Sequence, residues 1–85
     1  MKIKGSLEEE LKLAENKMES AKNDLARVKD SIRNRVKLDN FDAETLENYA
    51  RNIRNFQTAI EDSAQKINTY SYFLNLIKCE ENGLL

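Results

Sequence analysis

The stretch of sequence that decides the fold lies near the middle of the chain and reads Lys37-Leu38-Asp39-Asn40-Phe41-Asp42. It separates two long segments without proline, and the two glycines, Gly5 and Gly83, stand near the chain ends. Asn40 is the residue in this stretch best able to adopt a left-handed backbone, which ends a helix. Asp42 can then cap a second helix. We therefore expect the chain to reverse direction over residues 39–42.

Apolar residues before this turn recur in steps of four and three, which is the heptad repeat of a coiled coil. They are Leu7, Leu11, Ala14, Met18, Ala21, Leu25, Val28 and Ile32. Ser6 and Glu9 have the spacing of a capping box, so we expect the first helix to span about residues 7–38.

The segment after the turn repeats the heptad pattern, and Gly83 offers a stop. Its seam residues are Leu46, Tyr49, Ile53, Phe56, Ile60, Ser63, Ile67, Tyr70, Leu74 and Ile77. We expect this second helix to span about residues 43–81.

Folding the chain about Asp39 places every seam residue of one helix opposite a seam residue of the other. Small Ala21 then faces large Phe56, and Ala14 faces Ser63. This agreement predicts a single all-α domain, an antiparallel two-helix coiled-coil hairpin that dimerises into a four-helix bundle. Two separate coiled coils or one continuous helix are the alternatives, and the turn signals argue against both.

The end of the second helix carries more apolar side chains than one stripe can bury in a two-helix hairpin. Within the chain, only Met1, Ile3 and the Leu84-Leu85 tail are available to cover them. We expect a partner-binding surface here, formed by Tyr70, Tyr72, Phe73, Leu76, Ile77 and Cys79. The alternative is that the chain ends fold over this surface and close it.

Small residues in the middle of the seam have two interpretations. Ala14 and Ser63 form a thin layer, and Ala50, Ala59 and Ala64 flank the seam of the second helix. Such a layer admits further helices of a four-helix bundle, or it marks a close crossing within one hairpin.

Basic residues gather near the turn, where the sequence has seven cations and five carboxylates. The candidate contacts for an acidic partner or for phosphate are Lys29, Arg33, Lys37, Arg51 and Arg54. A solvated face with internal pairs such as Glu47–Arg51 and Arg35–Asp42 explains the same residues. We favour that explanation, because no aromatic residue interleaves the cations as in single-strand binders.

The sequence lacks the residues that most catalytic sites use. There is no histidine, a single cysteine and no glycine-rich phosphate loop, so we expect neither an enzyme nor a metal or cofactor site. The net charge of −1 gives no global attraction to nucleic acid. Without a signal peptide or an apolar membrane span, we expect a cytoplasmic protein.

The sequence favours an interaction module, such as a small adaptor, a chaperone-like protein or an inhibitor. Its expected partners are itself, as a homodimer or larger oligomer, or another protein. One alternative is a structural or secreted hairpin that pairs with a similar small protein. The expected shape resembles the helical hairpins of bacterial type VII secretion, but their Trp-x-Gly turn is absent here. A dimeric RNA-binding hairpin that uses the basic turn end is the other alternative.

Overall fold

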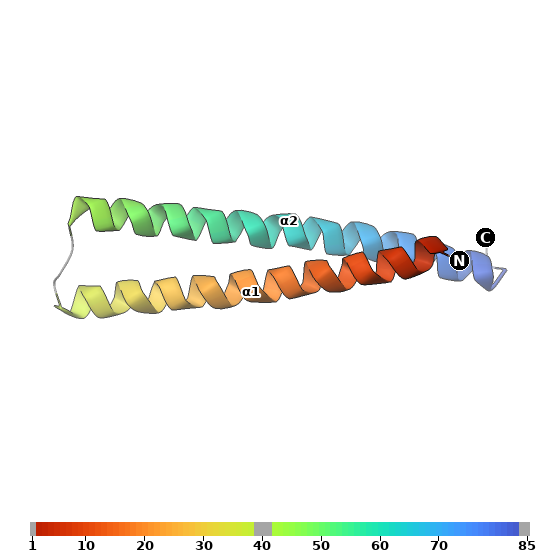
Figure 1. The fold of residues 1–85 in the computed structure, drawn as a ribbon, viewed down its shortest axis with the longest axis horizontal. Coiled ribbons are helices and arrows are strands. Elements are labelled where there is room, and N and C mark those ends of the chain that lie inside the picture. Colours follow the sequence, from red (N-terminus) through yellow and green to blue (C-terminus); the bar gives the residue numbers. More distant parts are fainter. Residues whose placement is uncertain (1, 39–41, 84–85) are drawn as a thin grey trace.

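Two long helices make up the fold of this protein in a computed structural model (Figure 1). They are α1 (Lys2–Leu38) and α2 (Ala43–Glu81), which pack antiparallel against each other. The structure describes residues 2–38 and 42–83, and the molecule measures 63 × 19 × 16 Å. The predicted all-α helical hairpin is therefore confirmed, and it is an extended rod.

The predicted cap of the second helix is present at Asp42. This residue has an extended backbone, and its Oδ1 accepts a hydrogen bond of 2.7 Å from the backbone N–H of Thr45. Its carbonyl oxygen accepts a bond of 3.2 Å from the N–H of Leu46. Asp42 thus fixes where α2 begins. The predicted left-handed backbone at Asn40 lies outside the described residues.

The other end of α2 stops as the sequence predicts. Gly83 has φ +71°, a left-handed backbone that glycine adopts without strain. Its N–H donates a hydrogen bond of 3.0 Å to the carbonyl oxygen of Glu80, and the N–H of Asn82 donates one of 3.0 Å to Lys78. These bonds satisfy two of the carbonyl groups that a helix end leaves without a partner.

The start of α1 differs from the sequence-based expectation. The helix begins at Lys2, so Ser6 lies inside it and does not cap it. Contacts with α2 account for the additional residues, because Lys4 Nζ lies 3.0 Å from Glu81 Oε2 and Ile3 lines a groove together with Phe73. These tertiary contacts outweigh the local capping preference of Ser6.

The predicted seam lies between the helices, but most of its residues are only half-buried. Almost every heptad residue is buried or half-buried, and Leu46 is the exception at 51% exposed. Only Ala14, Ala21, Ser63 and Leu74 are buried among the described residues. Three of these four are small, so the helices approach closely where Ala14 and Ser63 meet. The thin layer therefore forms a close contact within one hairpin.

Candidate functional site

The end of the hairpin that carries both chain termini, here called the open end, holds the predicted partner-binding residues. Tyr72 and Phe73 are exposed, at 61% and 46%. Leu74, which directly follows Phe73 in α2, is buried, with 5% of its surface exposed. The remaining predicted residues, which are Tyr70, Leu76, Ile77 and Cys79, are half-buried. The structure thus buries one stripe of this segment and leaves an aromatic pair on its outer side.

The exposed aromatic side chains contact each other and adjoin a groove. The ring centroids of Tyr72 and Phe73 are 6.0 Å apart with the planes tilted by 51°, which is a favourable aromatic arrangement. Next to them, α1 and α2 form the open-end groove, of about 470 Å³. It is lined by Ile3, Leu7, Phe73, Leu76, Ile77 and Glu80.

The sequence analysis began the first helix at residue 7 and named Ile3 as a residue that could fold over the open end, whereas in the structure Ile3 is part of α1. Ile3 is 57% exposed, so it borders the apolar surface without covering it. The tail residues that were expected as an alternative cover, Leu84 and Leu85, lie outside the described residues, as does Met1. The exposed side chains of Ile3 and Phe73 therefore leave apolar surface at the open end that a partner could contact.

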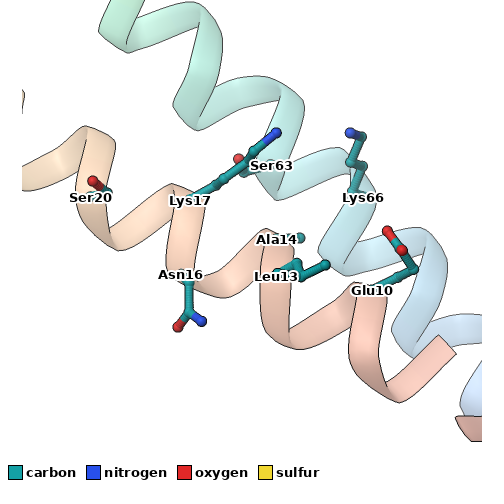
Figure 2. Close-up of a pocket in the computed structure, with 8 residues that line it drawn as sticks. All are labelled: Glu10, Leu13, Ala14, Asn16, Lys17, Ser20, Ser63 and Lys66. Atoms are coloured by element: carbon teal, nitrogen blue, oxygen red, sulfur yellow. The ribbon is translucent and has the colours of Figure 1, made fainter. Parts of the chain in front are cut away.

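A second groove lies over the thin layer in the middle of the rod, and the sequence analysis missed it. This central groove, of about 410 Å³, is lined by Glu10, Leu13, Ala14, Asn16, Lys17, Ser20, Ser63 and Lys66. Figure 2 shows Glu10 and Lys17 extending from α1 toward α2, while Asn16 points away. Leu13 is 56% exposed, and it stands outside the heptad positions on which the sequence analysis was based.

Both grooves lie on the same side of the hairpin. Ile3, Glu10 and Lys17 are spaced by seven residues along α1, and Lys66, Phe73 and Glu80 are spaced in the same way along α2. Residues at this spacing lie on one side of a helix in a coiled coil. We call this side of the hairpin the groove face. It combines exposed apolar residues with charges of both signs.

The basic residues near the turn form a solvated surface. Lys29, Arg33, Lys37, Arg51 and Arg54 are all exposed. Arg33 Nη1 lies 3.3 Å from Asp30 Oδ1 within the same helix. Exposed pairs of this kind contribute little stability. None of these five residues lines the open-end groove or the central groove.

Two ion pairs that the sequence suggested do not form between the described residues. Glu47 and Arg51 are not paired, and Arg35 does not reach Asp42. Instead, the guanidinium carbon of Arg35 lies 5.9 Å from the centre of the Tyr49 ring, a cation–π distance. The pKa of Asp42 is lowered chiefly by the backbone hydrogen bond from Thr45, and the charge of Arg35 is the smallest contribution.

Residues 2–38 and 42–83 contain no cluster of metal ligands and no membrane-spanning helix. No group of three histidine, cysteine, aspartate or glutamate side chains is placed to hold a metal ion there. Cys79 is a free, half-buried thiol. Neither α1 nor α2 contains a stretch long and apolar enough to cross a bilayer.

Comparison with known protein families, curated proteins and solved structures found no match.

Proposed function

We propose that this chain is a non-enzymatic protein-interaction module that binds through the open end of the hairpin. The observation that carries the proposal is the cluster of exposed apolar side chains there: Ile3, Tyr72 and Phe73 are each about half exposed or more. Clustered apolar surface is unusual on a protein that acts alone. Aromatic residues are enriched at the centres of protein interfaces, because they bury large areas.

The surroundings of this cluster also favour a protein partner. Lys4 and Glu81 form an ion pair beside it, with side chains 31% and 40% exposed. An apolar centre bordered by polar and charged residues is the usual arrangement of a protein interface. An adaptor, a chaperone-like protein or an inhibitor would each use such a surface.

Site-specific photo-cross-linking in the native host tests the proposal. A photoreactive amino acid at Tyr72 is expected to form a defined cross-linked protein band. The same amino acid at Gln57, an exposed position of α2 away from the open end, is expected to give none. Phe73→Asp in the Tyr72 variant should abolish the band, because it places a charge at the centre of the apolar contact. Far-UV circular dichroism should show unchanged helicity.

Two results would contradict the proposal. One is equal cross-linking from Tyr72 and Gln57, which would mean that the open end has no special affinity for protein. The other is a band from Tyr72 that persists in the presence of Phe73→Asp. If Phe73→Asp loses helicity, Phe73→Ser replaces it in the test, because this substitution removes the ring without adding a charge.

A further inference from the structure

The exposed area of this hairpin is larger than that of a compact protein of its mass. The chain exposes 6636 Å², against roughly 5,200 Å² for a compact monomer of 9.9 kDa. The excess is about 1,400 Å². A typical stable interface buries about 800 Å² on each partner. A single interface along one side of the rod would therefore remove more than half of the excess.

The charges on the groove face are complementary to those on a copy of the same face. The pairing of Ala14 with Ser63 sets the level of each residue along the rod, since the numbers of opposed residues add up to 77 or 78. Glu10 of α1 then lies near the level of Lys66 of α2, and Lys17 lies near the level of Asp62. Each of these two cations thus has a carboxylate close to its own level on the other helix.

The apolar residues of the groove face match in the same way. Ile3 lies at the level between Phe73 and Leu76, which line the open-end groove with it. Exposed Leu13 lies at the level of Ala64, one residue from Ser63, and it lines the central groove together with Ser63. A surface that fits itself in this way is the requirement for a two-fold symmetric dimer.

We infer that the groove face binds a second copy of this chain, with the two hairpins parallel and their open ends together. In this arrangement α1 of one copy packs on α2 of the other at equal level, so Ile3 meets Phe73 and Leu76, and Leu13 meets Ser63. Glu10 approaches Lys66 of the second copy, and Lys17 approaches its Asp62. The result is a four-helix bundle. The inference names the partner in the proposed function and rests on it.

A head-to-tail dimer about the central groove satisfies the same charges but leaves the apolar residues poorly matched. It would place Phe73 and Leu76 at the levels of Asn52 and Asn55 of the second copy. In that dimer, large apolar side chains would be buried against amide groups. Ile3 would also lose its contact with Phe73 of the second copy. The parallel dimer brings two basic turn ends together, but those cations are exposed, and salt screens their repulsion. Apolar burial at the open end therefore decides the orientation.

Light scattering after gel filtration over a range of protein concentrations tests the dimer. The wild-type protein is expected to reach twice the monomer mass. Leu13→Glu is expected to raise the dimer dissociation constant at least about tenfold, because it places a carboxylate in the interface. Val36→Glu is the matched control, with an expected change within about twofold. Val36 is exposed to a similar degree, 60% against 56%, and lies 23 residues along α1, about 140° around the helix.

The orientation is tested by the distance between spin labels at Glu47→Cys in a Cys79→Ser background. Parallel hairpins place both labels at the same end of the dimer, within about 35 Å of each other, whereas the head-to-tail dimer separates them by about 50 Å. The longer distance would overturn the parallel arrangement. A dimer that Leu13→Glu and Val36→Glu affect equally would overturn the role of the groove face.

The inference and the proposed function fail in different ways. A protein that stays monomeric at every concentration, while the Tyr72 variant cross-links a different protein, overturns the second copy as partner and leaves the proposed function standing. A Tyr72 variant that cross-links no protein, together with a monomeric mass, overturns both. Cross-linking of Tyr72 to the same chain, together with a dimeric mass, supports both.

Discussion

The two halves of this rod follow one heptad repeat and yet pack differently. Three of the four buried residues, which are Ala14, Ser63 and Leu74, lie in the half that contains the open end, and Ala21 lies next to the middle of α1. Between Ala21 and the turn, no described residue is buried, and Leu46 and Val36 are more than half exposed. Figure 1 shows the two ribbons farther apart at the turn than toward the open end.

The difference follows from the size of the seam residues. Small side chains at Ala14 and Ser63 let the helix backbones approach, so their neighbours are shielded from water. Near the turn, the opposed residues are large, as in the layer of Val28 with Tyr49. Arg35 then lies against the Tyr49 ring where a further apolar layer would otherwise stand. Both the best-packed seam and the exposed apolar surface therefore lie in the half with the open end.

The largest expected effect comes from a charge in the middle of the seam. Ile60→Asp buries a carboxylate without a partner between the helices, so it should cost roughly 3 kcal/mol or more and unfold the hairpin. Ile60 is half-buried, whereas Thr58 in the same helix turn is exposed. Far-UV circular dichroism during chemical denaturation measures both variants. Thr58→Asp should leave the free energy of unfolding nearly unchanged.

Equal loss of helicity in Ile60→Asp and Thr58→Asp would contradict the seam as the source of stability. Full helicity in Ile60→Asp would do so as well, since an intact hairpin cannot accommodate an unpaired charge there without loss of stability.

A matched pair of substitutions compares the two halves directly. Leu74 and Leu46 occupy equivalent heptad positions of α2, but Leu74 is 5% exposed and Leu46 is 51% exposed. Leu74→Ala should cost about 2–3 kcal/mol, since it removes buried methyl groups and leaves a cavity. Leu46→Ala should cost less than about 1 kcal/mol. Denaturant titration at a fixed protein concentration measures both. Equal costs would show that the two halves are packed equally well in solution.

The sequence was sufficient to predict the hairpin because its signals are local and periodic. The heptad positions give the seam, Asp42 gives the start of α2, and Gly83 gives its end. These features depend on backbone hydrogen bonds and on side-chain spacing along one helix. Such interactions can be evaluated without knowing what lies across the molecule.

The parts that the sequence analysis missed depend on contacts between distant segments. The capping preference of Ser6 is a local signal, but the pair between Lys4 and Glu81 joins residues 77 positions apart. Leu13 stands outside the heptad, so its exposure beside the central groove appears only when α2 is placed next to it. The sequence analysis named both the aromatic end of α2 and Ile3 as a residue available to it, whereas the exposure of Ile3 within α1 required the three-dimensional structure.

The smallest expected effect is electrostatic and lies at the turn. The hydrogen bond from the backbone N–H of Thr45 lowers the pKa of Asp42 below its usual value of 3.8. A carboxyl group with a lowered pKa in the folded state stabilises the fold at a pH above 3.8, and this stabilisation is lost as the pH falls through the folded pKa. Asp42→Asn keeps an acceptor for the cap but cannot ionise.

The wild-type protein should therefore melt slightly above the Asp42→Asn variant at neutral pH, and the difference should vanish under strongly acidic conditions. Thermal melts at about pH 7 and about pH 2 measure this difference. The effect should be small, because Asp42 is exposed and the adjoining seam is shallow. A difference that stays the same at both pH values would mean that the charge of Asp42 does not contribute to folding. The loose packing of the turn half would then be independent of how α2 is capped.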